Sequence, residues 1–303
     1  MKTQLITPTD IIMIRPHQFV SNPQTMQDNA FQVVACSKQI SQLAYDEVSK
    51  AAAQLSAAGI QVHLFEDEGN STPDSVFPNN WFSTHCSGEL ITYPMYVPNR
   101  RLELRQDIIA FIRERYQVSC YRDLSPLAEQ GWFLEGTGSI VIDHAGATAY
   151  AVASKRTDKT LFTEWCQQLG YQAQLFDATD ASGKAVYHTN VLMCVAEHFV
   201  LIGLDMVPKN QQTALLASFD KQQKTVITLS PEQINHFCGN AIELKGKDGN
   251  LLALSSTAYQ ALTPAQIAVI RQSAQLLPIE VSTIETAGGS LRCMIAGIHL
   301  AQR

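Results

Sequence analysis

Residues 134–142 read LEGTGSIVI, a carboxylate followed by four small residues and a short apolar run that predicts a strand. Four other segments also place a polar residue shortly before or within an apolar run. They are residues 78–82 (PNNWF), 187–195 (YHTNVLMCV), 238–244 (CGNAIEL) and 288–296 (GGSLRCMIA). One polar side chain from each segment gives the series Asn80, Glu135, His188, Asn240 and Cys293, at intervals of 55, 53, 52 and 53 residues. Such regular spacing indicates a repeated unit.

Helical and strand patterns alternate with the same period. Helices are predicted over residues 41–58, 99–115, 158–169 and 211–220, and a fifth begins after Thr263 and Pro264, an N-cap followed by proline at the first helical position. Strands are predicted to begin near residues 60, 116, 171, 224 and 278, the last of them reading PIEVSTI. The pattern favours a five-bladed, pseudo-fivefold α/β propeller, and an ordinary α/β domain with evenly spaced elements is the alternative. No linker-like stretch divides residues 1–303, so we expect a single domain.

The composition and charge of the chain argue against several classes of protein. The chain is 46% hydrophobic and 17% charged, as in ordinary globular proteins, and its net charge of −6 argues against a nucleic-acid partner. The N-terminus has no apolar signal region and no apolar run is long enough to span a membrane, so we expect a cytoplasmic protein. Seven cysteines without a CxxC pair and eight scattered histidines predict neither a disulfide framework nor a metal site.

In a closed ring, the five repeated side chains would face one central axis. Cys293 is then the candidate nucleophile, His188 the acid and base, and Glu135 the group that orients the histidine. Gly288 and Gly289 precede the cysteine and would let backbone approach a small ligand. Each residue also has a plainer interpretation: a buried core thiol, a histidine bonded at a strand end, or a solvated loop carboxylate. Asn190, two residues after His188, would point to the same side of a strand.

LEGTG, YHTN and GGSLRCM, in this order, resemble the motifs of the pentein superfamily, which includes arginine deiminase, dimethylarginine dimethylaminohydrolase and the amidinotransferases. The resemblance covers almost the whole chain. It implies a five-bladed α/β propeller, catalysis by Cys293, His188 and Glu135, and no metal or organic cofactor. It also implies that Asp74 contacts the amino-acid end of the substrate and that Arg100 holds the substrate carboxylate, although a surface arginine is the alternative for Arg100.

The paired carboxamides Asn79 and Asn80 set the chain apart from these relatives. Where arginine-directed members carry acidic residues, this chain has Asn79, Asn80 and Asn190. A carboxylate accepts hydrogen bonds from a cationic guanidinium, whereas an amide both donates and accepts and suits a neutral ureido group. The chain therefore most closely resembles the citrulline-hydrolase branch, with Asn79, Asn80, Asn190 and Asn240 expected to contact substrate and ornithine, ammonia and carbon dioxide expected as products.

Two other functions are consistent with the sequence. One is a hydrolase or amidinotransferase of arginine or a related guanidine, with Asp74 as the needed carboxylate. The other is a catalytically inactive pentein that serves as a binding module, which the presence of Cys293, His188 and Glu135 argues against. The oligomeric state stays open, a homodimer being one option.

Overall fold

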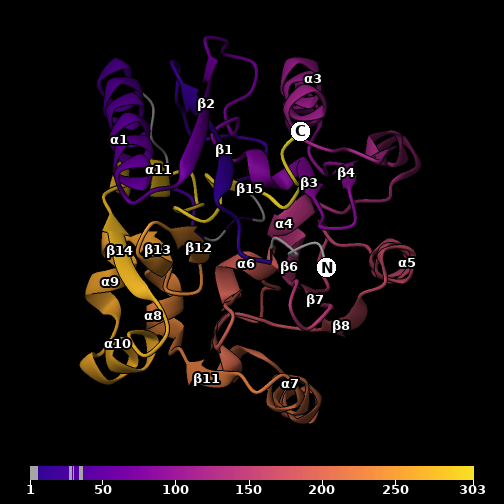
Figure 1. Cartoon of the computed structure of the whole chain (residues 1–303), viewed down its shortest axis with the longest axis vertical. Helices are drawn as coiled ribbons and strands as arrows, with labels where there is room; N and C mark the ends of the chain where they lie inside the picture. Colours follow the sequence, from indigo (N-terminus) through magenta and orange to yellow (C-terminus); the bar gives the residue numbers. More distant parts are fainter. Residues whose placement is uncertain (1–5, 27–28, 30, 34–36) are drawn as a thin grey trace.

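Five three-stranded sheets surround a central axis in the computed structural model, which describes residues 6–26, 29, 31–33 and 37–303 (Figure 1). The strands are β1 (Asp10–Pro16), β2 (Gln61–Asp67), β3 (Phe82–Thr84), β4 (Glu89–Thr92), β5 (Cys120–Asp123), β6 (Ile140–Asp143), β7 (Thr148–Val152), β8 (Gln172–Phe176), β9 (Met193–Val195), β10 (Phe199–Ile202), β11 (Thr225–Thr228), β12 (Ile242–Gly246), β13 (Gly249–Ser255), β14 (Gln275–Ile279) and β15 (Ala296–Ile298).

Every sheet follows one pattern: its first strand pairs antiparallel with the middle strand, and the third strand pairs parallel with it. Four sheets use consecutive strands, while the fifth joins β15 to β1 and β2. The last strand of the chain therefore completes the blade that the first strand begins, which closes the ring. The pseudo-fivefold α/β propeller expected from the repeat is confirmed.

Parallel pairing needs a crossover, and helices on the outer rim of the ring supply it (Figure 1). The crossover helices are α1 (Lys38–Ala57), α3 (Gln106–Arg115), α5 (Lys159–Leu169), α7 (Lys209–Lys221), and α9 (Ser256–Ala261) with α10 (Pro264–Ile270). The shorter helices are α2 (Pro98–Arg101), α4 (Gly136–Ser139), α6 (Thr189–Leu192), α8 (Pro231–Asn235), α11 (Ser282–Glu285), and the 3₁₀ turns η1 (Pro78–Asn80), η2 (Ser125–Gln130) and η3 (Leu204–Met206).

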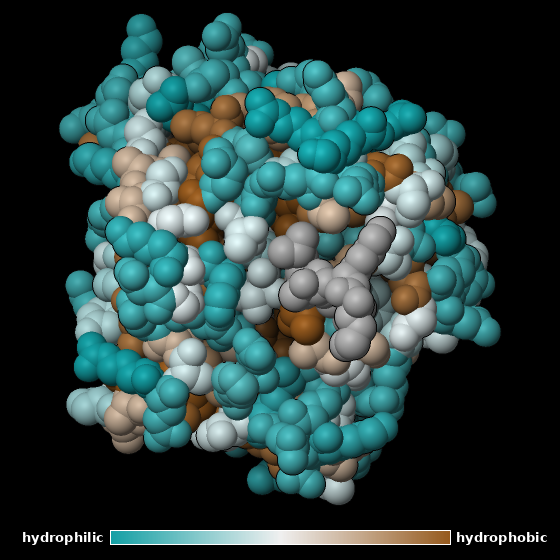
Figure 2. All heavy atoms as spheres, viewed as in Figure 1, coloured by the Kyte–Doolittle hydropathy of each residue, from teal (hydrophilic) through white to brown (hydrophobic). Residues whose placement is uncertain are grey.

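The crossover helices bury one face against the sheets. In α1 the buried residues are Ala44, Val48, Ala51, Ala52 and Leu55, the spacing of a single helical stripe. Hydrophilic side chains cover most of the outer rim in the view of Figure 2. No helix among the described residues is long and apolar enough to cross a membrane.

Most helices and strands begin and end where the local sequence signals predict. Thr263 caps α10 through a capping box with Gln266, as its position before Pro264 predicts. Gly170 ends α5 in the left-handed conformation with φ +76°. The strand expected at residues 60–65 lies at Gln61–Asp67, within one or two residues of the prediction.

Three of the predicted helices and strands have other bounds in the structure. The helix expected over residues 99–115 is two helices, because the chain turns after α2 so that α3 can bury Ile108, Ile109 and Ile112. The strand expected over residues 116–121 lies at Cys120–Asp123. The strand expected in PIEVSTI begins earlier, at Gln275, and Ser282–Glu285 is helical, with the amides of Thr283 and Ile284 donating to the carboxylate of Glu47.

Candidate active site

The five repeated side chains all lie just before the inner strand of a blade. Asn80 ends η1 before β3, Glu135 and His188 precede the short helices that lead into β6 and β9, Asn240 precedes β12, and Cys293 precedes β15. All five are buried, with at most 3% of each residue exposed. The propeller thus brings together five positions spread over more than 200 residues: Asn80, His188 and Cys293 line one cavity, Glu135 contacts His188, and Asn240 contacts Cys293.

Glu135 and His188 form a direct pair. Nε2 of His188 lies 2.7 Å from Oε2 of Glu135. The other carboxylate oxygen of Glu135 accepts from the backbone amide of Tyr96 at 2.8 Å, which fixes the plane of the carboxylate. With Nε2–H donated to Glu135, Nδ1 of the histidine keeps its lone pair and can accept a proton.

Burial and neighbouring charges shift the pKa values of Glu135 and His188 in opposite directions. Burial would raise the pKa of Glu135, but the charge of Arg156 and the hydrogen bond from His188 outweigh it, so the pKa lies well below its usual range. Burial lowers the pKa of His188 to about 4, and the neighbouring Glu135 offsets only part of this effect. At neutral pH the pair therefore consists of a carboxylate and a neutral imidazole, the form of histidine that serves as a base.

Two carboxamides face the sulfur of Cys293. Nδ2 of Asn190 and Nδ2 of Asn240 each lie 3.3 Å from Sγ. Nδ2 of Asn240 also donates to the carbonyl oxygen of Asn190 at 2.8 Å. Asn190 lies in a helical turn and not on a strand as expected, so it reaches the site through the turn of α6. Two amide donors from neighbouring blades therefore lie within hydrogen-bonding distance of the sulfur.

A small cavity opens beside Cys293. Thr25, Asn29, Asp74, Phe77, Asn80, Arg100, Arg156, Tyr187, His188, Ala287, Gly288, Gly289 and Cys293 line it. The glycine pair fits closely: a Cβ on Gly288 would meet the side chain of Asn29 at 2.3 Å, and one on Gly289 would meet the ring of Phe77 at 2.8 Å. Asn29 and Phe77, whose side chains such a Cβ would meet, also line the cavity.

The two asparagines of residues 79–80 differ in position. Asn80 lines the cavity, and its Nδ2 has no hydrogen-bond partner among the described residues. Asn79 is fully buried but does not line the cavity, and its carbonyl oxygen accepts from Thr137 Oγ1 at 3.1 Å. Contrary to the expectation for the pair, the structure brings only Asn80 to the cavity wall. A 3₁₀ turn separates neighbouring side chains by a third of a turn, which sends the two amides in different directions.

Arg100 is buried at the cavity wall, so the interpretation as a surface arginine was wrong. Its Nε and Nη2 bond both oxygens of Glu103 at 2.8 and 2.9 Å, and its Nε lies 3.6 Å from Oδ2 of Asp74. Asn22 donates to the same oxygen of Asp74 at 2.8 Å, while Oδ1 has no partner among the described residues. Burial raises the pKa of Asp74, and the charge of Arg100 lowers it in part. Asp74 thus presents one unsatisfied oxygen to the interior of the site.

Sequence analysis missed Arg156. It is 1% exposed, lines the cavity, and its guanidinium lies 3.4 Å from Oε2 of Glu135 and 4.9 Å from the ring centre of Tyr187. Arg156 stands outside the repeated segments, after β7, so the period of the chain could not select it.

Comparisons with known proteins agree with this architecture. Five such sheets around a buried cysteine and histidine define the pentein superfamily. The chain belongs to the family described as N,N dimethylarginine dimethylhydrolase, eukaryotic, whose family model matches residues 15–300. No curated protein matches the chain.

Solved structures share the fold at low sequence identity. The N-terminal domain of ArgZ, an arginine dihydrolase from the ornithine-ammonia cycle in cyanobacteria, was solved as a variant bound to substrate. It is 14% identical, with a TM-score of 0.76 over 96% of this chain and 98% of that chain. Unliganded AgrE is 14% identical, with a TM-score of 0.76 over 97% of this chain but 40% of AgrE.

A variant of dimethylarginine dimethylaminohydrolase, solved as an adduct with S-methyl-L-thiocitrulline, is 14% identical. Its TM-score is 0.65 over 96% of this chain and 99% of that chain. These relatives include enzymes that act on C–N bonds of guanidino substrates.

Proposed function

We propose that the protein is a cysteine hydrolase that cleaves the ureido group of an amino acid, with L-citrulline as substrate and ornithine, ammonia and carbon dioxide as products. The observation that carries the proposal is the set of carboxamides around Cys293. Asn190 and Asn240 lie 3.3 Å from its sulfur, and Asn80 faces the cavity. Among the described residues that line this cavity, the one carboxylate is Asp74, whose Oδ2 already contacts Arg100 and Asn22.

A neutral reacting group fits these surroundings better than a cation does. The cavity wall carries the cationic side chains of Arg100 and Arg156 and the single carboxylate of Asp74. The arginines favour the α-carboxylate of an amino acid and Asp74 favours its ammonium group. The neutral ureido group would then lie among amides, with Nδ2 of Asn80 donating to the ureido oxygen as negative charge builds there.

In the proposed reaction His188 takes up and releases a proton twice: from the thiol to the leaving nitrogen, and then from water to the departing sulfur. Nδ1 of the histidine takes the thiol proton as Sγ of Cys293 attacks the ureido carbon, and Glu135 stabilises the imidazolium that forms. The imidazolium protonates the side-chain nitrogen of ornithine as its C–N bond breaks, leaving a carbamoyl thioester on Cys293. His188 then removes a proton from water, which attacks the thioester. Carbamate and the free thiol result, and carbamate decomposes to ammonia and carbon dioxide.

The second candidate is hydrolysis of a guanidino substrate, and the comparisons favour it. ArgZ is an arginine dihydrolase, and one AgrE variant was solved with L-arginine. Full-length ArgZ and AgrE are longer, since this chain covers 40% of each. In this case Asp74, through its unsatisfied Oδ1, would provide the carboxylate that a guanidinium needs. Transfer of the group to an amine instead of water belongs to the same candidate.

A substrate panel distinguishes the two candidates. We would incubate the protein with L-citrulline, L-arginine, methylated arginines or agmatine, and measure ornithine, citrulline and ammonia over time, with the Cys293→Ser protein as the control for contaminating enzymes. The proposal expects ornithine and ammonia in equal amounts from citrulline and a much lower kcat/KM for arginine. A higher kcat/KM for arginine, whether it yields citrulline or ornithine, would instead establish the guanidino candidate.

A further inference from the structure

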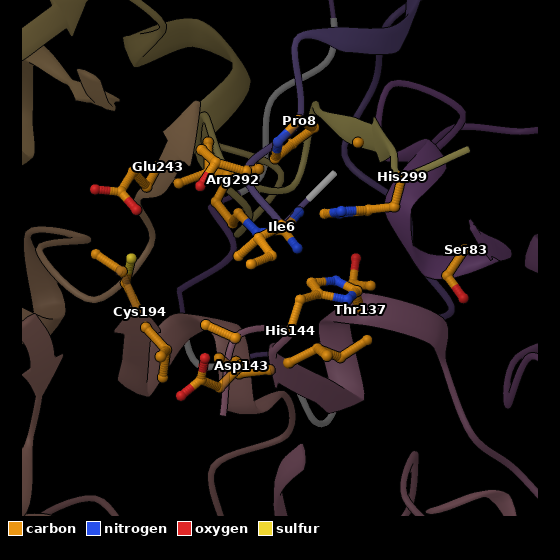
Figure 3. A pocket seen from close by; sticks show the side chains of 18 of the residues that line it. Ile6, Pro8, Ser83, Thr137, Asp143, His144, Cys194, Glu243, Arg292 and His299 are labelled. Atoms are coloured by element: carbon orange, nitrogen blue, oxygen red, sulfur yellow. The ribbon is translucent and has the colours of Figure 1, made fainter. Parts of the chain in front are cut away.

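A second, larger cavity, shown in Figure 3, is lined by a different set of residues. Thr137 and Arg292 line this cavity, whereas Asn80 and Cys293 line the smaller one, and no residue in the described part of the chain lines both. The proposed reaction uses no residue of the larger cavity.

Three potential metal ligands converge beside this cavity: Cys86, His144 and His299. His144 and His299 directly follow the inner strands β6 and β15, and Cys86 comes two residues after β3. Their donor atoms, the sulfur and one ring nitrogen from each histidine, all lie within 4.8 Å of one another. The propeller therefore gathers the active-site residues where the inner strands begin and these three residues where the strands end.

The three side chains are only partly buried, so an ion could reach them. The rings of His144 and His299 stack with their centres 3.8 Å apart, and Figure 3 shows them facing one another at the cavity wall. Cys86 takes part in no disulfide. Thiolate sulfur and imidazole nitrogen are the ligands that Zn²⁺ prefers, and three protein ligands leave a fourth tetrahedral position for water.

The surroundings of His144 match those of a metal-binding histidine. Such a histidine usually donates its second ring N–H to a fixed acceptor, which orients the ring. Nδ1 of His144 lies 3.1 Å from the hydroxyl of Tyr171, and this hydroxyl lies 3.2 Å from Nδ1 of His85. His85 in turn contacts Ser83 Oγ at 2.8 Å. When Tyr171 accepts from Nδ1 of His144, the Nε2 lone pair is available to a metal ion.

We propose that Cys86, His144 and His299 form a zinc site at the end of the propeller axis, separate from Cys293. The ligands belong to three different blades, since β15, β3 and β6 lie in different sheets. They are far apart in the unfolded chain, so the ion binds the folded chain selectively. Binding therefore stabilises the folded state, by about 2.7 kcal/mol when free Zn²⁺ is at 100 times its Kd.

The test uses the full chain carrying Cys293→Ser, so that the active-site thiol cannot bind the ion. We would titrate this metal-free protein with Zn²⁺, measuring stoichiometry by calorimetry and Tm by scanning fluorimetry. A parallel titration uses Co²⁺, which gives a thiolate-to-metal absorption band when cysteine is a ligand. We expect one ion per chain, a rise in Tm and the absorption band.

Variants in the same background assign the ligands. Cys86→Ser should remove the Co²⁺ band, and His299→Ala should weaken Zn²⁺ binding at least tenfold, while Tyr171→Phe should weaken it about 10- to 100-fold through the orientation of His144. Cys120→Ser, at another partly exposed cysteine, is the matched control and should bind like the parent. The Tm of each variant without metal shows whether the variant folds. If Cys86→Ser does not fold, His299→Ala still tests the site.

The proposal is overturned if the Cys293→Ser protein binds no stoichiometric Zn²⁺. It is equally overturned if folded Cys86→Ser and His299→Ala proteins retain the parent's affinity and Co²⁺ spectrum. Neither result depends on which substrate the enzyme hydrolyses, so the zinc site and the proposed function can fail independently.

Discussion

His188 donates from Nε2 to Oε2 of Glu135 across 2.7 Å, and both residues are at most 2% exposed. A buried carboxylate beside a buried imidazole holds one tautomer of the ring and stabilises its protonated form during a reaction. Replacing Glu135 by glutamine keeps the shape but removes the negative charge.

We expect Glu135→Gln to lower kcat about 10²- to 10⁴-fold, the usual contribution of a positioned acid–base group, with a much smaller change in KM. Steady-state kinetics with citrulline measure this, and Glu129→Gln, at an exposed glutamate, is the control. A variant with more than a tenth of the wild-type kcat would show that Glu135 does not support the catalytic histidine.

Cys293→Ser is expected to abolish turnover and leave the fold intact, because the thiol is proposed as nucleophile and not as packing. Intact-mass spectrometry of rapidly quenched reactions should show a substrate-derived adduct on the wild-type protein and none on the variant. Cys120→Ser should retain activity. Cys86, Cys166, Cys194 and Cys238 should also be dispensable for chemistry, as should Cys36, which lies outside the described residues. Measurable turnover by the folded variant would remove Cys293 from the mechanism.

The ureido proposal makes a charge prediction at Asn80. A carboxylate there would face the ureido oxygen, and losing about 3 kcal/mol of transition-state stabilisation lowers kcat/KM for citrulline roughly 100-fold. Asn80→Asp should also raise the ratio of kcat/KM for arginine to that for citrulline. Asn79→Asp is the neighbouring control: its side chain does not line the cavity, so the ratio should stay unchanged even if stability falls. If Asn80→Asp leaves the ratio of kcat/KM for arginine to that for citrulline unchanged, Asn80 does not recognise a ureido group.

Gly138 is required by close packing of the site. A Cβ there would lie 2.3 Å from Nδ2 of Asn80 and 2.8 Å from Nδ1 of His188. Gly138→Ala should therefore reduce kcat/KM at least tenfold by displacing both side chains. Gly170→Ala is the contrasting control: nothing lies near its Cβ, but φ is +76°, so it should cost about 1 kcal/mol of stability and leave activity unchanged. Equal activity of the two variants would exclude this steric role for Gly138.

The depressed pKa of His188 predicts a pH-dependent contribution to stability. Its pKa falls from 6.5 in the unfolded chain to about 4 in the folded protein. The unfolded state therefore binds more protons between these values, and the stability contributed by neutral His188 is complete above pH 6.5 and is lost as the pH falls towards 4.

The His188→Gln variant lacks this titration. Its free energy of unfolding relative to wild type should therefore rise by roughly 2 kcal/mol between pH 7.5 and pH 5. Urea unfolding of both proteins at the two pH values measures the difference. A difference that is independent of pH would mean that folding does not shift the pKa of His188, and a difference that falls would mean that folding raises this pKa.

Much of the fold and part of the candidate site followed from local sequence signals. Helix caps such as Thr263 and Gly170 act through neighbouring backbone groups, so they can be read from a few residues. The repeat selected Asn80, Glu135, His188, Asn240 and Cys293, because equivalent positions of similar blades must occupy equivalent places around a closed ring. The prediction of a single domain over residues 1–303 and the roles of these residues stay predictions.

Tertiary structure alone decided the rest. Arg156 lies outside the repeated segments, and Asn79 lies within one but not at its repeated position. Only packing could therefore bring Arg156 to the cavity and direct Asn79 away from it. The partners of Arg100 likewise depend on how α2 turns into the interior. Cys86, His144 and His299 lack the short spacing of familiar metal motifs, and their positions in sequence predicted no metal site. Their convergence depends on the closure of the ring by β15 and β1, a long-range pairing that no local pattern encodes.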